Sequence, residues 1–363
     1  MKPGTFFKPC ILNTKPYQGG STRGENGERK VYKLSSNENL LGASPKAIRA
    51  IKENLHMLHE YNFLDDGRFR EALACSFDFA IGAEYFFTAN SGMELLDLIC
   101  RGFLEPGDQC ILSTPTFLAY KSFAEVGGAS VIDIPLQPKD FSLQVENILG
   151  AVNEKTKIIF ISSPNNPTGS IVTSNEMEVL VENLPAQVLI VYDEVYHHYV
   201  DHPKYARAID FIKKEYPVIG LHSFSKAYGL AGIRLGYAFS TPAITGYLRQ
   251  LRRPFMINSL SMEAGMAALK DKEHIQKTME MVEGEKRWLY QELKKFGISY
   301  WPSHANFILF RSPYETGHFA ADMLESGVMV RTGEVFGAGG CIRVTVGTRE
   351  ANAAFINILK MIV

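Results

Sequence analysis

The feature that most constrains the fold is an alternation, from Tyr85 to about Ser240, of short apolar runs with segments of helical periodicity. The apolar runs are nearly continuous, which is typical of strands in a sheet that is covered on both faces. The predicted strands are residues 85–87, 110–112, 131–134, 158–161, 188–192, 218–221 and 235–239. Residues 93–103, 117–126 and 176–184 carry apolar side chains at helical spacing. The pattern predicts an α/β lobe with a mostly parallel sheet between helices.

A second, smaller lobe is predicted from residue 271 onward. Apolar side chains recur every seven residues among charges from Ile275 to Phe296, and Gly297 follows, which indicates one long amphipathic helix between two lobes. The segments that follow predict an α+β unit. They are strand-like at residues 307–310, 328–331 and 342–346, and helical at residues 316–325 and from residue 349 onward. Residues 18–30, rich in glycine and charge, predict a mobile loop in an N-terminal arm. We therefore expect an arm and small-domain segment (1–45), a large domain (46–270) and a C-terminal part (271–363).

Composition narrows the functional classes. A length of 363 residues is enough for about two lobes. The chain has 38 Lys and Arg against 39 Asp and Glu, a formal charge of -1, so no global field would attract a nucleic acid. Its five cysteines are widely spaced and form no Cys-x-x-Cys pair, which favours a reducing compartment. Without a run of signal-peptide or membrane-spanning character, we expect a cytoplasmic protein that binds neither membranes nor nucleic acid.

Polar motifs follow several of the predicted strands, in a fixed order. They are residues 164–169 (PNNPTG), 193–196 (DEVY), 223–226 (SFSK) and Arg234 within residues 229–237 (GLAGIRLGY). Ligands of open α/β sheets bind beyond the carboxyl ends of the strands, so these groups are expected to converge on one cleft.

Each motif also has an ordinary explanation as a turn, a cap or a surface segment, and three other functions match parts of the pattern. The S-x-x-K pattern at Ser223 and Lys226 would suit an acyl hydrolase, but the companion S-D-N and K-T-G motifs are missing. Histidines 197, 198 and 202 suggest a metal site, but neighbours on a strand point to opposite faces, so a solvated loop is favoured and no metal is expected. A binding-only regulator or carrier is the third alternative.

Taken together, the ordered motifs resemble the fold-type I pyridoxal phosphate aminotransferases, and within them the histidinol-phosphate aminotransferase branch. The similarity runs from about Tyr17 to nearly the C-terminus. The resemblance implies pyridoxal 5'-phosphate as cofactor, held as a Schiff base by Lys226, whose amine later moves a proton. It places Asp193 beside the pyridine nitrogen, where a carboxylate favours the protonated ring. Asn166 and Tyr196 would hydrogen-bond the ring's phenolic oxygen.

The resemblance also assigns the remaining site residues. Groups matching the phosphate-binding positions are Ser91, Gly92, Met93, Ser223, Ser225 and Arg234, with Phe117 at the position that stacks on the ring. Tyr61 matches a tyrosine that reaches the cofactor phosphate across a homodimer interface. Tyr17, Arg331 and Arg343 match groups that contact the substrate, together with Asn166.

The chain departs from the family pattern in places. Leu40 follows Asn37-Glu38-Asn39 where relatives usually have proline, and Met93 stands at a usually acidic position. These departures leave the cofactor set intact and bear on the substrate. The expected reaction transfers an amino group from histidinol phosphate, the small-molecule donor, to 2-oxoglutarate, the 2-oxo acid acceptor. An aromatic amino-acid aminotransferase and a phosphothreonine-type decarboxylase share the same cofactor constellation and stay open as alternatives.

Overall fold

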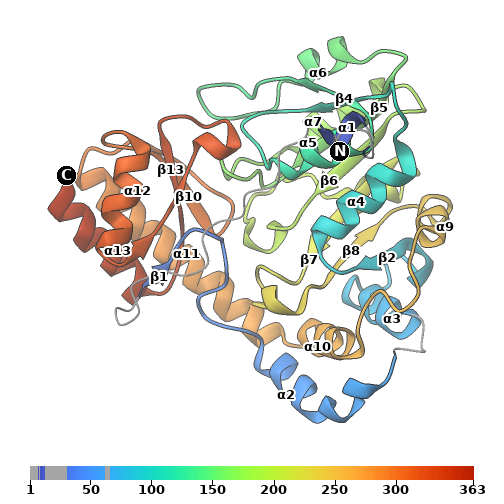
Figure 1. Ribbon diagram of the computed structural model, residues 1–363, viewed down its shortest axis with the longest axis horizontal. Helices are drawn as coiled ribbons and strands as arrows, with labels where there is room; N and C mark the ends of the chain where they lie inside the picture. Colours follow the sequence, from blue (N-terminus) through green and yellow to red (C-terminus); the bar gives the residue numbers. More distant parts are fainter. Residues whose placement is uncertain (1–6, 8, 13–30, 62–65) are drawn as a thin grey trace, which may run out of the picture.

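The computed structural model describes residues 7, 9–12, 31–61 and 66–363. Figure 1 shows a large lobe, in which helices flank a central sheet, and a smaller lobe, coloured orange and red, at its side. The predicted loop at 18–30 and Tyr17 lie outside the described residues. A short helix, α1 (Pro9–Leu12), precedes the gap at residues 13–30.

The large lobe contains a sheet of order β2-β8-β7-β6-β5-β3-β4. All neighbouring pairs are parallel except the two that β8 makes with β2 and β7. The expected mostly parallel sheet is therefore confirmed, and each predicted strand overlaps an observed one. The strands are β2 (Phe86–Ala89), β3 (Gln109–Leu112), β4 (Ser130–Asp133), β5 (Thr156–Ser162), β6 (Leu189–Asp193), β7 (Val218–Ser223) and β8 (Gly236–Phe239).

Two hydrophobic cores cover the two faces of this sheet. One contains apolar residues of α4, α5 and α9, and the other contains residues of α2, α3, α6, α7, α8 and α10. Strand β6 contributes to both, because successive side chains of a strand point to opposite faces. The helices are α2 (Pro45–Glu53), α3 (Gly67–Ser76), α4 (Gly92–Phe103), α5 (Ala119–Val126), α6 (Val145–Ala151), α7 (Ser174–Asn183), α8 (Ala208–Ile212), α9 (Pro242–Gln250) and α10 (Ser259–Leu269), with 3-10 turns η2 (Leu55–His59), η3 (Ala83–Tyr85), η4 (His197–Tyr199) and η5 (Ala231–Ile233).

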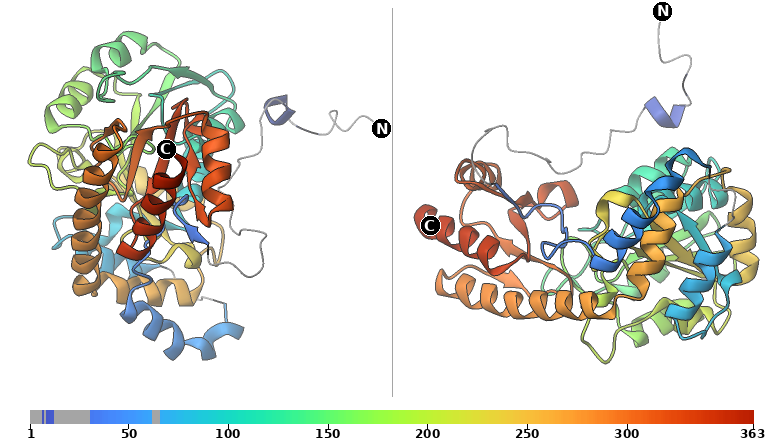
Figure 2. Two further views of the ribbon diagram at one scale, coloured as in Figure 1. Left: turned by 90° about the vertical axis from the view of Figure 1, so that its left-hand side faces the viewer. Right: turned by 90° about the horizontal axis from the view of Figure 1, so that it is seen from below.

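A long helix, α11 (Lys272–Lys295), connects the lobes as its seven-residue pattern predicts. Ile275, near its start, packs against the cores of both lobes. The right-hand view of Figure 2 shows the helix running from the large lobe along the smaller one. Whether residues 45 and 270 are the domain boundaries stays a prediction.

The smaller lobe is built on a four-stranded sheet of order β12-β13-β10-β9 and a two-stranded one, β1-β11. The single strand expected at 328–331 is wrong: β11 pairs with β1 of the N-terminal segment and β12 pairs with β13, because the chain changes partners at Val330. The elements are β1 (Tyr32–Lys33), β9 (Tyr300–Trp301), β10 (Phe307–Arg311), α12 (Thr316–Glu325), β11 (Val328–Met329), β12 (Arg331–Thr332), η6 (Glu334–Phe336), β13 (Cys341–Thr345) and α13 (Arg349–Ile362).

Candidate active site

A cavity of about 300 Å³ lies where the carboxyl ends of β5, β6 and β7 face the smaller lobe. Thirteen of the fifteen predicted site residues line it, as the convergence of strand ends requires. They are Ser91, Gly92, Met93, Phe117, Asn166, Asp193, Tyr196, Ser223, Ser225, Lys226, Arg234, Arg331 and Arg343.

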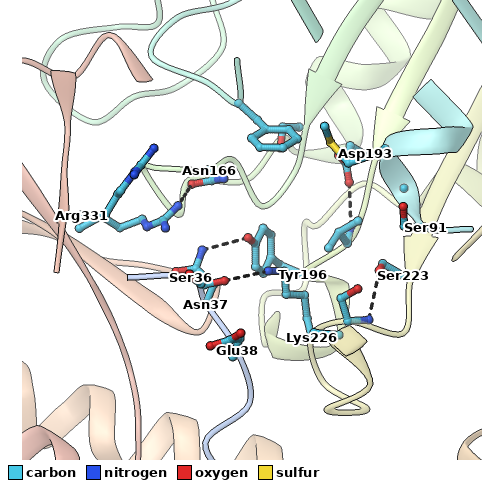
Figure 3. Close-up of a pocket in the computed structure, with 18 of the residues that line it drawn as sticks. Ser36, Asn37, Glu38, Ser91, Asn166, Asp193, Tyr196, Ser223, Lys226 and Arg331 are labelled. Atoms are coloured by element: carbon cyan, nitrogen blue, oxygen red, sulfur yellow. Dashed lines mark hydrogen bonds between the residues drawn. The ribbon is translucent and has the colours of Figure 1, made fainter. Parts of the chain in front are cut away.

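Lys226 lies in the turn that follows β7 (Figure 3). Its Nζ donates to the carbonyl oxygen of Ser36 over 3.2 Å and lies 5.7 Å from the centre of the Tyr196 ring. Burial, followed by the positive charge of Arg343, lowers the pKa of the Lys226 amine from 10.5 to about 8. A neutral, nucleophilic amine is therefore accessible near neutral pH.

Asp193 ends β6 and points toward the same cavity. The hydroxyl of Tyr120 donates to its Oδ2 over 2.7 Å, and the backbone N–H of Val195 donates to Oδ1 over 3.1 Å. Burial raises the pKa of this carboxyl, although both hydrogen bonds and the charge of Lys226 oppose the rise. Tyr120 was missed from the sequence, because its helical spacing in α5 is equally typical of a core residue.

The part of the cavity beside the start of α4 is suited to a phosphate. Helix α4 begins at Gly92, after Ser91 in a backbone conformation with φ 90°, and a Cβ atom added at Gly92 would meet nothing within 4 Å. Gly236 allows β8 to approach this helix start, because a Cβ there would lie 2.9 Å from the Gly92 nitrogen. The free N–H groups of a helix start and its dipole favour an anion.

Side chains complete this donor set. Ser223 and Ser225 also line the cavity, and the Ser223 hydroxyl oxygen accepts from the Ser225 N–H over 3.1 Å. Arg234 is exposed, and one of its guanidinium nitrogens donates to the Ala231 carbonyl over 2.7 Å. The phosphate of pyridoxal phosphate fits this part of the cavity. It would find open space at the start of α4, serine hydroxyls and the Arg234 guanidinium.

The smaller lobe supplies two arginines. Arg331 of β12 and Arg343 of β13 are directly opposite each other in the antiparallel pair. Arg343 is buried, donates to Asn166 Oδ1 and to the Ser35 carbonyl, and lies 4.9 Å above the Phe336 ring. Arg343 is therefore not a surface residue. Arg331 and Arg343 both line the cavity.

Residues 33–38 form a cavity wall that the sequence did not assign. Lys33, Ser35, Ser36, Asn37 and Glu38 all line the cavity. The Lys33 ammonium lies 2.8 Å from a Glu38 carboxylate oxygen. Leu40, where the chain departs from the family pattern, is not among the residues of this wall.

Of the two remaining predicted residues, one lies away from the cavity and the other lies outside the described residues. Tyr61 is 69% exposed and stacks on Phe255 with ring centres 4.8 Å apart. Tyr17 lies outside the described residues.

The solvated loop expected for the three histidines is wrong for His197 and His198, whereas His202 is exposed. His197 and His198 lie in η4, where their ring centres are 3.9 Å apart, and His197 stacks on His222 at 3.8 Å. A 3-10 turn, unlike a strand, brings successive side chains together. Burial lowers the pKa of both rings well below 6.5. Within the described residues, no three His, Cys, Asp or Glu side chains are placed to hold a metal ion.

Comparison with known proteins identifies the family. The model of the aminotransferase class I and II family matches residues 29–359. The chain belongs to this family. Its fold-type I architecture and its cofactor, pyridoxal phosphate, follow from that membership. Because the family consists of aminotransferases, the acyl-hydrolase and binding-only alternatives are excluded.

Relatives and solved structures agree with this assignment. The chain is 36% identical to histidinol-phosphate aminotransferase 2 of Carboxydothermus hydrogenoformans, over 98% of this chain and 99% of the relative. It is 35% identical to the histidinol-phosphate aminotransferase of Moorella thermoacetica, over 98% and 92%. The crystal structure of histidinol-phosphate aminotransferase from Sinorhizobium meliloti in complex with pyridoxal-5'-phosphate superposes with a TM-score of 0.88 at 22% identity, over 98% of each chain. The branch expected from the motifs is thus confirmed.

No helix in the described part of the chain combines the length and apolar character that crossing a bilayer requires.

Proposed function

We propose that this aminotransferase moves the amino group of L-histidinol phosphate to 2-oxoglutarate, in the cytoplasm and as a homodimer. The observation that carries the proposal is the pair of opposed arginines, Arg331 and Arg343, in the cavity that holds Lys226. The donor carries a dianionic phosphate, and glutamate, formed in the other half-reaction, carries two carboxylates. Guanidinium groups bind both kinds of anion by bidentate pairing, which a lysine cannot match.

Residues of the large lobe would hold the cofactor. Ser91, Gly92, Met93, Ser223, Ser225 and Arg234 surround the space suited to its phosphate, and Phe117 lies beside the space for its ring. When bound, pyridoxal phosphate supplies an electron-withdrawing ring that stabilises negative charge at the Cα of the amino donor. The Asp193 carboxylate favours a proton on the pyridine nitrogen, since an opposite charge stabilises the cation.

Lys226 performs the proton transfers. Its Nζ would take the proton from the Cα of the donor and deliver it, in the same half-reaction, to the cofactor carbon that receives the amino group. In the second half-reaction it would carry a proton in the reverse direction, to the Cα of the 2-oxo acid. A pKa near 8 suits an amine that must both accept and release a proton near neutral pH. Asn166, which accepts from Arg343, links the substrate-binding arginine to the end of β5.

Arg331→Leu tests the substrate. Because Arg331 is half-buried, loss of its ion pair is expected to cost about 2 kcal/mol, or about 30-fold in kcat/KM for histidinol phosphate. Phenylalanine, which lacks the phosphate, should lose much less. Arg311→Leu is the control, because Arg311 is an exposed arginine of the same small-lobe sheet that lies over Trp301 rather than in the cavity.

The wild-type protein provides the decisive comparison of donors. Higher kcat/KM with phenylalanine or tyrosine than with histidinol phosphate would establish the aromatic aminotransferase instead. Release of carbon dioxide from phosphothreonine would identify a decarboxylase. Equal losses for both donors in Arg331→Leu would remove Arg331 from phosphate recognition.

The proposed homodimer rests on Tyr61. Its exposed ring, stacked on Phe255, lies outside the cavity of its own chain, as a residue donated to a second copy would. Lys226→Ala chains mixed with Tyr61→Ala chains should regain activity, because one site of each mixed dimer has both native residues. Verified mixed dimers without recovered activity would contradict the shared site.

A further inference from the structure

The charged side chains on the cavity wall are mostly basic. In the described part of the chain the basic ones are Lys33, Lys226, Arg234, Arg331 and Arg343, and the acidic ones are Glu38 and Asp193. Asp193 accepts from Tyr120 and lies where the pyridine nitrogen of the cofactor is expected. Of the two carboxyl groups, Glu38 is therefore the one that a substrate can meet.

Glu38 belongs to a segment that contacts both the substrate-binding arginine and the reactive lysine. The Ser35 carbonyl accepts from Arg343. The Ser36 carbonyl accepts from Lys226 Nζ over 3.2 Å, and Figure 3 shows Glu38 further along the same segment. The negative charge of Glu38 opposes the lowering of the Lys226 pKa, so this carboxylate acts on the reaction centre. A donor that is bound by Arg343 and loses its proton to Lys226 lies along this segment.

The Glu38 carboxylate is held by an ion pair at the edge of the cavity. Its Oε1 lies 2.8 Å from Lys33 Nζ, and the two side chains are 40% and 26% exposed. Lys33 pairs in register with Met329 of β11, two positions before Arg331. A partly exposed pair of this kind contributes little to stability. A carboxylate accepts through both oxygens, so one hydrogen bond with Lys33 leaves capacity for a ligand.

The two substrates of the proposed reaction differ in what they could offer to this carboxylate. Histidinol phosphate and glutamate both carry anions for the arginines, but only histidinol phosphate carries an imidazole, whose ring N–H is a hydrogen-bond donor. A carboxylate binds such a donor through a charge-assisted hydrogen bond, whereas it repels the carboxylates of glutamate.

We propose that Glu38 is a substrate-binding residue that accepts a hydrogen bond from the imidazole N–H of the amino donor. The cavity then recognises the donor at two points, the phosphate through arginines and the ring through a carboxylate. This inference rests on the proposed function and extends it from the phosphate of the donor to its ring.

Glu38→Gln tests the ring contact, because it keeps the size of the side chain and removes the charge. Phenylalaninol phosphate is the matched donor, since it has the same amine and phosphate on a ring without an N–H. Wild-type holoenzyme should favour histidinol phosphate over it by about tenfold or more in single-turnover kcat/KM, and Glu38→Gln should reduce this preference about tenfold. With glutamate, Glu38→Gln should react as fast as wild type or faster, because a repelling charge is gone. A merely structural loss would slow all three donors.

Lys33→Gln is the control, because it breaks the same ion pair from the other side. The amide of the new side chain still donates to the carboxylate, so histidinol phosphate should keep its advantage over phenylalaninol phosphate within about threefold, even if both react more slowly. Equal loss of the ring preference in Lys33→Gln and Glu38→Gln would mean that the pair only braces the wall, and would overturn the role of Glu38.

Binding without chemistry gives a second measurement. Imidazolylethyl phosphate and phenylethyl phosphate lack the amino group and cannot react. Calorimetric Kd values with the wild-type holoenzyme should favour the imidazole compound, and Glu38→Gln should lose about tenfold of that difference. Equal Kd values for the two compounds in the wild type would contradict the ring contact.

The outcomes distinguish this inference from the proposed function. A wild-type enzyme that prefers phenylalanine or tyrosine to histidinol phosphate would contradict both. An enzyme that uses histidinol phosphate but accepts phenylalaninol phosphate equally well, or keeps its full ring preference in Glu38→Gln, would overturn the role of Glu38 alone. The wild-type comparison needs no substitution, so it decides the question even if Glu38→Gln does not fold.

Discussion

Asp193 and Glu194 are adjacent carboxylic acids at the end of β6, yet the two side chains lie in different surroundings. Asp193 contacts Tyr120 and faces the cavity. Glu194, only 2% exposed, accepts from Tyr205 and from the Ala208 N–H, each over 3.2 Å, and lies 3.4 Å from His222 Nε2. Since successive strand residues point to opposite faces, one carboxyl reaches the site and the other is enclosed behind it.

The surroundings act differently on the pKa of the two carboxyl groups. Burial raises the pKa of Glu194 from 4.5 to about 8 and lowers that of His222 to about 3, so both are neutral at pH 7. Asp193 shares its cavity with the Lys226 amine, whose charge lowers the Asp193 pKa against the effect of burial. The comparison teaches that burial leaves Glu194 an uncharged structural acid, whereas the neighbouring Asp193 lies where a cationic amine opposes the effect of burial.

The largest expected difference is in turnover. Asp193→Asn keeps the size of the side chain but removes the charge that stabilises a protonated pyridine nitrogen. Loss of one preorganised electrostatic partner typically lowers kcat by on the order of 100- to 1,000-fold. Glu194→Gln, the matched substitution one residue later, should retain kcat within about tenfold, because Glu194 is already uncharged. Steady-state kinetics at pH 7, corrected for cofactor content, compare the two.

Similar losses of kcat in Asp193→Asn and Glu194→Gln would contradict the expected difference between the two carboxyl groups. An unchanged kcat in Asp193→Asn would remove Asp193 from the reaction.

The sequence was informative where chemistry depends on strand ends. Apolar runs located the strands, so Asn166, Asp193, Ser223 and Lys226 could be placed on one edge of the sheet before any coordinates were known. The resemblance then supplied roles that spacing alone cannot give. Assigning Arg343 to the site needed both the strand pattern and the resemblance, because the burial of Arg343 depends on the smaller lobe, which folds back over the strand ends.

The residues missed from the sequence act through contacts between distant segments. Tyr120 looks like any core residue of an amphipathic helix, and only the fold brings it to Asp193. Asn37 reaches Tyr196 across 159 positions and Thr345 across 308. The periodicity of apolar residues shows which face of a helix or strand is buried, but it carries no information on contacts between distant segments. For the same reason it could not show that Glu194 is enclosed.

A smaller effect is expected on the pH dependence of cofactor capture. Attack on the cofactor aldehyde needs a neutral Lys226 amine, so the capture rate should rise about tenfold per pH unit up to about pH 8 and then level off. The Asp193 charge raises the Lys226 pKa, so Asp193→Asn should move the midpoint to lower pH. Glu194→Gln should leave it in place. Stopped-flow absorbance after mixing cofactor-free protein with pyridoxal phosphate measures the midpoints, and a shift in Glu194→Gln of the same size would refute the separation.

The smallest expected effect concerns stability. The folded-state pKa of Glu194 is raised from 4.5 to about 8, so the folded protein binds an extra proton between these values. Its contribution to the free energy of unfolding is therefore full below about pH 4.5 and is lost as the pH rises through 8. Glutamine keeps the hydrogen-bonding capacity and does not titrate.

Glu194→Gln should consequently gain in melting temperature relative to wild type, by a few degrees, between pH 6 and pH 8.5. Other titrating groups are common to both proteins, so the difference between the two melting curves isolates residue 194. Glu178→Gln, at a half-buried position whose carboxylate pairs with Lys214 at the surface, serves as the control and should show no such trend. A difference in melting temperature that stays constant from pH 6 to pH 8.5 would contradict an uncharged Glu194. It would mean that Glu194 is charged throughout this range and has a cationic partner. The nearest such partner is a protonated His222, at 3.4 Å.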